Sequence, residues 1–269
     1  MRALFHPAPL GVTLAAVVLL AGCATPPPAS DPDALAEFHE TNDPLEPTNR
    51  VFYAINDGLD TVILRPLAVA YRYAVPEVVR THTHDVLANL GSPVLLANDM
   101  LETRPRRAGD TLMRFLINST IGVAGVFDVA SDWGYPAHSA DFGMTLALWG
   151  IPDGPFLFLP VIGPTNPRDA VGFGVDAAAD PLNYFGKGTA VTVLEYSRYG
   201  ISAIDARAAV LDDVDKIKAQ ALDPYATFRS LARQHRSGEI SDNQTDEPAT
   251  VPAWFARPQA APGTKPATP

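Results

Sequence analysis

The sequence predicts a mostly α-helical protein built from short amphipathic helices that change direction at prolines and glycines. Apolar residues recur every three or four positions through much of the chain, as expected for helices with one buried face. Many of the 26 prolines in the 269 residues stand where a helix would start, a position that tolerates their missing N–H. Apolar and polar residues do not alternate over more than a few positions, so long strands are not expected.

The N-terminus has the pattern of an export signal. An apolar run over residues 10–20 follows Arg2 and is too short to span a bilayer. It is followed by Leu-Ala-Gly-Cys ending at Cys23, which resembles the lipobox of bacterial lipoproteins, where the cysteine carries covalent lipid. Because Cys23 is the only cysteine, we predict a signal peptide over residues 1–22 and lipidation at Cys23. The alternative is a soluble exported protein with an incidental cysteine.

Residues 23–41, rich in proline and small residues, are predicted to form a lipidated flexible tether. A helix should then start at residue 44, since Asp43 suits the N-cap and Pro44 the first helical position. We expect this helix to stop near Pro66. Its apolar stripe has spacings of 7, 3, 4 and 4 and consists of Leu45, Phe52, Ile55, Leu59 and Ile63.

Prolines and glycines divide the next part of the chain into further predicted helices. They are expected over residues 66–74, 76–90 and 94–101. Gly91 should end the second of these, and Pro93 should start the third. Another amphipathic helix is expected from residue 106. We expect it to continue through residues 117–130, which are apolar nearly all round, as in helices buried in protein or lipid.

Residues 141–172 combine short apolar blocks with a proline or glycine at the end of each block. No block reaches the roughly 20 apolar residues of a spanning helix, so the stretch is a buried core, a binding wall or a surface at a membrane interface. Residues 156–159 lie between two prolines and cannot form a sustained helix, and a strand there has no obvious partner. We predict an apolar lip that faces lipid, with burial in a helical core as the simpler alternative.

Three further helices complete the predicted fold. Asn166 should cap the first, and Asp180 should end it. The longest helix is expected over residues 189–221, and the last over residues 225–236. Residues 237–269 contain little to bury and are predicted to be a disordered, proline-rich tail.

The charge of the chain limits its partners. The formal net charge is −10, so a basic face for nucleic acid is not expected. The same sign disfavours attraction to anionic lipid headgroups, so membrane affinity has to be apolar and covalent. With one cysteine, no intrachain disulfide can form.

The sequence contains no recognisable catalytic or cofactor site. His82 and His84 lie two positions apart and would point to different sides of a helix, which disfavours a metal site with Asp85. The triplet at residues 141–143 resembles the magnesium loop of kinases, but the rest of that framework is missing. No Gly-x-Ser-x-Gly motif is present, and scattered carboxylates are explained by caps and turns. We therefore expect no enzyme, no metal and no cofactor.

Several sequence blocks resemble the MlaA (VacJ) lipoproteins of Gram-negative outer membranes. The first reads Asn-Asp-Pro-Leu-Glu-Pro-Thr-Asn-Arg over residues 42–50, and the resemblance extends to residue 236. The other blocks are Phe52 with Asn56, and residues 65–66, 114–122, 127–130, 141–150, 154–164 and 168–169. So many blocks in the same order identify residues 42–236 as one MlaA-like helical domain.

The resemblance implies a ring of amphipathic helices around a central channel, lying in one membrane leaflet. It also implies a role: removing mislocalised phospholipid from the outer leaflet, associating with an outer-membrane porin trimer and passing lipid to a soluble periplasmic carrier. The chain would lie on the periplasmic side of the outer membrane, anchored through Cys23. The residues proposed to line the channel or face the membrane are Asn118, Gly122, Gly125, Phe142, Gly143, Trp149, Gly154, Phe156, Phe158 and Leu159.

Two other functions remain open from the sequence. One is an anchored scaffold that binds porins and has no lipid channel of its own, in which the apolar blocks are simply core. The other is a lipid-hydrolysing enzyme, for which the sequence offers no nucleophile.

Overall fold

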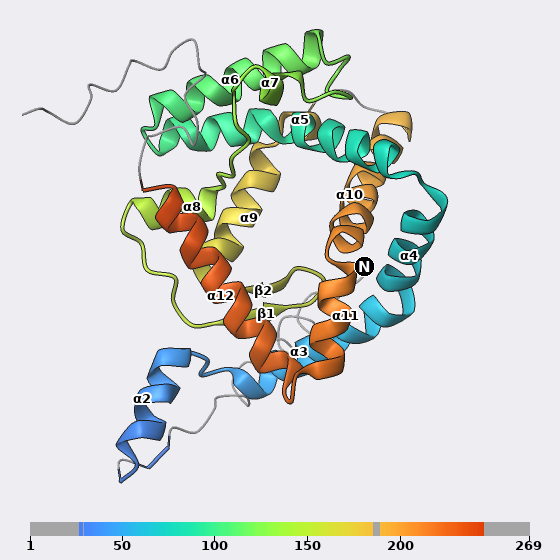
Figure 1. Ribbon diagram of the computed structural model, residues 1–269. Helices are drawn as coiled ribbons and strands as arrows, with labels where there is room; N and C mark the ends of the chain where they lie inside the picture. Colours follow the sequence, from blue (N-terminus) through green and yellow to red (C-terminus); the bar gives the residue numbers. More distant parts are fainter. Residues whose placement is uncertain (1–26, 29, 185–188, 245–269) are drawn as a thin grey trace, which may run out of the picture.

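A computed structural model describes residues 27–28, 30–184 and 189–244, and its helices form a closed ring (Figure 1). In chain order its elements are α2 (Pro32–Thr41), α3 (Glu46–Leu59), a π turn (Asp60–Leu64), α4 (Arg65–Ala74), α5 (Glu77–Leu101), α6 (Pro105–Thr120), α7 (Val129–Asp132), α8 (Phe142–Leu148), β1 (Leu157–Leu159), β2 (Gly163–Thr165), α9 (Pro167–Ala179), a 3-10 turn (Pro181–Asn183), α10 (Thr189–Ala209), α11 (Leu211–Gln220) and α12 (Pro224–Asp242).

Four groups of elements make up the sides of the ring. In Figure 1, α5 forms the top, α10 and α11 the right, α3 and the β-hairpin the bottom, and α8, α9 and α12 the left. α6 packs along the outer side of α5, and α4 lies outside α10. The predicted fold class, a mostly helical ring, is confirmed. Among the described residues, none of the helices is both long enough and apolar enough to cross a bilayer.

The first predicted helix begins and ends differently in the structure. α3 starts at Glu46, and Asp43 is buried instead of capping the helix with its side chain. The expected stop at Pro66 is absent, because the π turn carries α3 directly into α4. Proline lacks an N–H and crowds the carbonyl four residues earlier, and the wider turn before Pro66 relieves that conflict.

The predicted break at Gly91 and Pro93 is wrong, because α5 is a single helix with Pro93 inside it. A proline in a helix interior costs about 3 kcal/mol relative to alanine. Packing of α5 along α6 offsets this cost, and the two helices share a hydrogen bond in which Asn89 Nδ2 donates to Ser119 Oγ at 3.0 Å. Tertiary packing therefore overrides the local signal at this position.

The predicted continuation of the helix from residue 106 as far as residue 130 is also wrong. α6 ends at Thr120, and residues 121–127 form turns in which Val123 and Ala124 have φ values of 54° and 58°. Ile121, Val123 and Phe127 are exposed, so this apolar stretch is not core.

The side chain of Asn118 shapes this loop. Its Nδ2 donates to Asp128 Oδ1 at 2.9 Å, and its Oδ1 accepts from the backbone N–H of Ala130 at 2.9 Å. Asp128 in turn caps α7 by accepting from the backbone N–H of Ser131. The loop thus has its own hydrogen-bond partners and does not need helical ones.

Residues 156–159 have the strand partner that the sequence did not reveal. β1 pairs antiparallel with β2, with Leu157 opposite Thr165 and Leu159 opposite Gly163. Phe156 and Phe158 are 4% and 5% exposed and pack with Tyr225 of α12. The prediction that these two phenylalanines face lipid is therefore wrong, and the exposed apolar residues of the hairpin are Val161 and Ile162 at its tip.

The C-terminal half follows the predicted caps more closely. Asn166 caps α9 by accepting from the backbone N–H of Asp169, and α9 ends immediately before Asp180. The long predicted helix is divided at Val210 into α10 and α11. α12 continues past the predicted end at residue 236, because Asn243 at its C-terminus is buried and donates to Ser139 O at 2.9 Å.

The boundaries proposed for the tether and tail differ from the structure where it describes them. Helix α2 occupies residues 32–41 of the predicted tether, and α12 occupies residues 237–242 of the predicted tail. The signal peptide, Cys23 and residues 245–269 lie outside the described residues.

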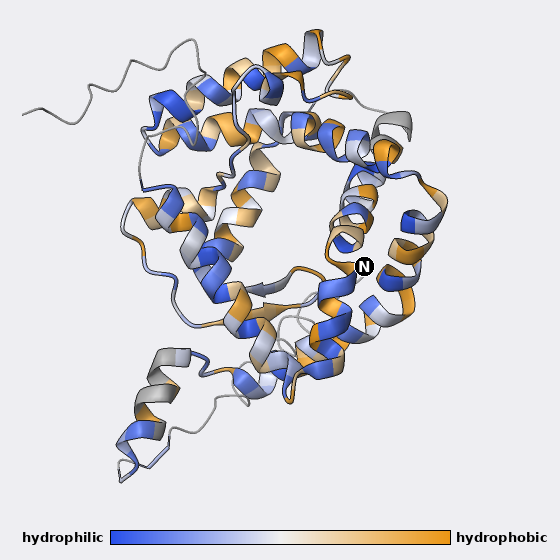
Figure 2. Cartoon of the chain, viewed as in Figure 1, coloured by the Kyte–Doolittle hydropathy of each residue, from blue (hydrophilic) through white to orange (hydrophobic). Residues whose placement is uncertain are grey.

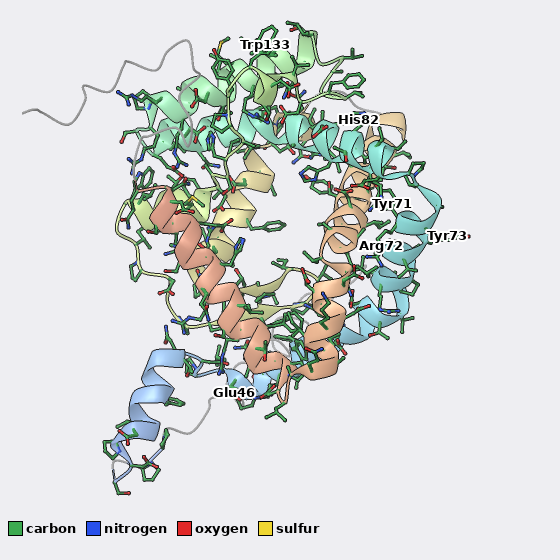
Figure 3. The ribbon with its side chains drawn as sticks, in the orientation of Figure 1. Glu46, Tyr71, Arg72, Tyr73, His82 and Trp133 are labelled. Carbon is green, nitrogen blue, oxygen red and sulfur yellow. The ribbon has the colours of Figure 1, made fainter. Side chains whose placement is uncertain are left out.

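The interior of the ring wall is more polar than apolar. Of the described residues, nine buried side chains are apolar and sixteen are polar or charged, which reverses the usual pattern of a globular core. Hydrophobic residues are instead spread around all sides of the ring (Figure 2). Tyr73 and Trp133 lie at its outer edge (Figure 3), and Tyr73 is 93% exposed.

Candidate functional site

Three asparagines hold the β-hairpin against α3. Asn42, Asn49 and Asn56 are seven residues apart, so they recur on one face of this segment. Asn42 Nδ2 donates to Gly154 O at 2.7 Å. Asn49 donates to Phe156 O at 3.0 Å and accepts from Phe158 N–H at 2.9 Å.

Asn56 repeats this two-way contact further along the hairpin. It donates to Leu159 O at 2.9 Å and accepts from Val161 N–H at 2.8 Å. The side-chain amides thus satisfy the edge of β1 in the way that a neighbouring strand would. We call Asn42, Asn49 and Asn56 the asparagine ladder.

A buried carboxylate joins the start of α3 to α12. Asp43 is 2% exposed and accepts from Tyr225 Oη at 2.5 Å and from Arg229 Nη1 at 2.8 Å. Burial, together with the hydrogen bond to Asp43, raises the pKa of Tyr225. The guanidinium of Arg50 lies 4.5 Å from the centroid of the same tyrosine ring. This cluster fixes the corner where the two ends of the ring meet.

A second cluster joins α12 to α8 and α9. Arg236 makes two hydrogen bonds of 2.7 Å to Asp141 and bonds of 2.9 and 3.1 Å to Asp169. Burial opposes the charge of Asp169, but the hydrogen bonds from Arg236 and Arg168 overcome it and lower the pKa of Asp169. The triplet at residues 141–143 therefore has a structural role, with Asp141 also capping α8.

Glycines allow α8 and α9 to approach closely at this cluster. A Cβ on Gly172 would lie 2.2 Å from Gly143 N, and a Cβ on Gly143 would lie 2.6 Å from Asp169 Oδ1. Neither position has room for any side chain.

A third polar cluster lies between α5, α6 and α8. Asp99 is fully buried, accepts from Thr111 Oγ1 at 2.5 Å and lies 3.0 Å from His138 Nε2. Glu102, one turn further, accepts from Thr145 Oγ1 at 3.2 Å, and its Oε2 has no hydrogen-bond partner among the described residues. Burial raises the pKa of Glu102 to about 7, and the nearby charge of Asp99 adds to this rise.

Replacing Glu102 by Gln is expected to stabilise the protein at alkaline pH. The folded state holds the proton up to about pH 7, whereas the unfolded state releases it near 4.5, so the free energy of unfolding of the natural protein falls as pH rises through this range. Glu102→Gln keeps the neutral form, so its advantage should reach at most roughly 3 kcal/mol at pH 8 and vanish below about pH 4.5. Urea unfolding at several pH values measures this.

The matched control is Glu77→Gln, at an exposed position of the same helix. It should show no gain that grows with pH. A constant difference between Glu102→Gln and the natural protein from pH 4 to pH 8 would contradict the burial argument.

Two cavities border the hairpin. The first has a volume of about 420 Å³ and is lined from α9, α12 and the hairpin. Its charged residues are Asp141, Asp153, Asp169, Asp176, Glu239, Arg233 and Arg236. The second has a volume of about 470 Å³ and is lined mainly by apolar residues of α3, the π turn, the hairpin, α11 and α12. Both volumes fall within the range of about 300–1,000 Å³ found for small-molecule sites.

The glycines predicted to line a channel are packing positions in the structure. A Cβ on Gly122 would lie 2.3 Å from Phe127 O, and one on Gly125 would lie 2.5 Å from the Cβ of Asn89. At Gly122, Gly125 and Gly143, a Cβ atom would collide with neighbouring protein atoms. This corrects the prediction that these glycines form a channel wall. Gly154, with a φ of 75°, turns the chain against Pro167 and borders the first cavity.

The remaining predicted site residues fall into two groups. Asn118 is buried and shapes the loop before α7, so it is also a structural residue. Trp149 is about half exposed, donates from Nε1 to Leu101 O at 3.2 Å and lies edge-on to Phe142. A membrane-facing role for Trp149, Phe142 and the partly buried Leu159 stays a prediction.

Among the described residues, no group of three or more His, Cys, Asp and Glu side chains is arranged to hold a metal ion. His82 Nδ1 lies 3.7 Å from Asp85, whereas His84 Nδ1 lies 3.1 Å from Asp205 on α10. The two histidines thus have different neighbours.

The asparagine ladder and the clusters around Asp43 and Arg236 were not predicted from the sequence. The seven-residue spacing of Asn42, Asn49 and Asn56 is a visible signal, because polar amides recurring on one helix face need partners. Asp43 carried no such signal, since its position before a proline is equally typical of a helix cap.

The fold defines a class: ring-shaped, mostly helical proteins with a polar interior and exposed apolar side chains. Within it, the chain belongs to the MlaA lipoprotein family, whose family model matches residues 41–239. This family is one of phospholipid-transport lipoproteins.

Named relatives and a solved structure agree with this assignment. The Haemophilus influenzae intermembrane phospholipid transport system lipoprotein MlaA is 31% identical over 238 residues, which cover 87% of this chain and 91% of the relative. The Escherichia coli K12 protein of the same name is 31% identical over 215 residues, or 78% and 80% of the two chains. An uncharacterised Rickettsia bellii protein is 36% identical over 202 residues, covering 75% of this chain and 78% of the relative.

A solved structure reported as "Structural basis for maintenance of bacterial outer membrane lipid asymmetry" superposes on this chain with a TM-score of 0.64. It is 30% identical and covers 74% of this chain and 98% of its own.

Proposed function

We propose that this chain is an outer-membrane lipoprotein that passes mislocalised phospholipid from the outer leaflet to a soluble periplasmic carrier. The observation that carries the proposal is the reversed distribution of polarity, with a polar interior and large apolar side chains exposed around the ring. Exposed apolar surface on this scale is costly in water and favourable in lipid. A ring seated in one leaflet would bury that surface in the lipid, while its polar side chains stay paired with one another inside the ring wall.

The anchor and the partners follow from the same proposal. Cys23 would carry the acyl chains and hold the ring on the periplasmic side of the outer membrane. A porin trimer would fix its position in the membrane, and the carrier would receive the lipid. Transfer would follow the relative affinities of the partners for phospholipid and would need no catalytic group in this chain.

Deleting the protein is expected to raise outer-leaflet phospholipid and detergent sensitivity in the bacterium that makes it. The natural chain should restore both, whereas Cys23→Ser, which removes only the lipid attachment, should not. The measurements are chemical labelling of surface phospholipid and growth in detergent. Normal lipid asymmetry in the deletion strain would contradict the proposal.

Purified protein separates the remaining alternatives. The proposal expects phospholipid to co-purify with the lipidated chain and to move from labelled vesicles to the soluble carrier when the chain is present. A scaffold would carry no phospholipid and would not speed transfer. A hydrolase would release fatty acid or lysophospholipid, whereas the proposal expects intact lipid by mass spectrometry.

A further inference from the structure

The apolar cavity beside the hairpin has the lining of a site for a hydrocarbon chain. Its volume is about 470 Å³, and its walls include Tyr53, Leu59, Ile63, Phe158, Val214 and Phe228. Leu59, Ile63 and Val161 are 40%, 49% and 85% exposed, so large apolar side chains lie at the open side of the cavity. An acyl chain could enter there directly from a surrounding leaflet, with apolar contacts throughout.

One end of this cavity is charged but balanced. Lys218 Nζ lies 2.6 Å from Asp57 Oδ1 and 2.7 Å from Asp60 Oδ2. Arg207 donates from Nε to Asp60 at 2.6 Å and from Nη2 to Asp215 at 3.4 Å. The cavity-lining charges, two cations and two carboxylates, neither repel nor strongly attract an ion.

A single donor at this end lacks a partner. Arg207 is 9% exposed, and its buried Nη1 has no hydrogen-bond acceptor among the described residues. A buried N–H of a guanidinium group without an acceptor is unfavourable, so the arrangement favours a ligand that brings an oxygen to this point. An apolar peptide would bring many backbone groups that this lining cannot satisfy.

We propose that this cavity binds an acyl chain of the transported phospholipid, with an ester or phosphate oxygen of that lipid accepting a hydrogen bond from Arg207 Nη1. The inference rests on the proposed function and adds a location for the lipid in the ring wall. The π turn contributes Asp60, Ile63 and Leu64 to the site, so the one irregular turn between α3 and α4 has a place in lipid binding.

A photoactivatable phosphatidylethanolamine with a diazirine in its acyl chain tests the location. The full lipidated protein is irradiated with this probe in vesicles, digested and examined by mass spectrometry. The expected result is label on peptides containing Tyr53, Val214 or Phe228. Val214→Trp should fill the cavity and remove that label, while Val62→Trp, at an exposed position of the π turn that does not line the cavity, should keep it.

Arg207→Lys tests the polar contact separately. Lysine keeps a cation near Asp60, but its single Nζ cannot replace both Nη atoms of the guanidinium. Labelling by the phospholipid probe should therefore fall. Label from a diazirine alkane, which has no oxygen, should not change. An equal response of both probes would overturn the contact with Arg207, and circular dichroism confirms that each variant is folded.

The outcomes distinguish this inference from the proposed function. Label elsewhere on the ring and none in the cavity would overturn the inference while leaving lipid passage intact. No label anywhere on the natural protein would count against both. Cavity label that appears only in Cys23→Ser would show that the chain's own acyl anchor occupies the cavity, which also overturns the inference.

Discussion

Replacing Arg236 by Met is expected to lower the free energy of unfolding by roughly 2–3 kcal/mol, because the mostly buried Asp169 and the partly exposed Asp141 lose the cation they share. Arg236 holds Asp141 at the start of α8 and Asp169 in the first turn of α9. Without it, the two negative charges face each other at a closely packed helix contact. Urea unfolding of the full chain in mild detergent, followed by circular dichroism, measures the loss.

Arg65→Met is the matched control for this substitution. Arg65 pairs with Asp215 at 2.8 Å, but Arg65 is 46% exposed, and Asp215 keeps a second partner in Arg207 when Arg65 is removed. Exposed ion pairs contribute little, so this variant should unfold almost as the natural protein does. Equal losses in the two variants would show that burial at Arg236 does not matter.

Replacing Asn49 by Asp is expected to cost more than about 3 kcal/mol, since it places an unpaired charge where two hydrogen bonds are donated. The substitution keeps the size of the side chain and the acceptor for Phe158 N–H. It loses the donors to Phe156 O and to Asp43 Oδ1, which lie 3.0 and 2.8 Å from Nδ2. Two carboxylates would then lie side by side in a buried site.

Thermal melts and limited proteolysis of the hairpin measure the loss of stability in the Asn49→Asp variant. Asn56→Asp provides a graded comparison, because Asn56 makes the same kind of contact at the more exposed end of the asparagine ladder. Its melting temperature should fall less. An Asn49→Asp variant as stable as the natural chain would show that the ladder does not hold the hairpin.

Local signals predicted those elements whose ends are fixed by neighbouring residues. Asn166 caps α9 as expected, because an N-cap needs only a backbone N–H two or three residues away. Pro93 and residues 121–127 were mispredicted for the opposite reason. Packing against α6 decides the first, and the hydrogen bonds of Asn118 decide the second.

The residues of the candidate site were harder to predict from local sequence patterns. Phe156 and Phe158 are buried because Tyr225 packs against them. No local sequence pattern predicts a packing partner so far away in the sequence. The orphan nitrogen of Arg207 likewise depends on where Asp60 and Asp215 come to lie. The ring was predicted from the family resemblance alone. Helix patterns show where each helix ends, but they do not show how successive helices are arranged in space.

The cluster at Asp43 also constrains the order in which the chain acquires its shape. Tyr225 is 182 residues from Asp43 along the sequence, so the contact that joins the two ends cannot form until nearly the whole domain has been synthesised. Neighbouring helices such as α5 and α6 can pair long before that. Folding is therefore expected to end with the docking of α12 onto the start of α3, after the hairpin has bound α3 through contacts that span only 103 to 112 residues.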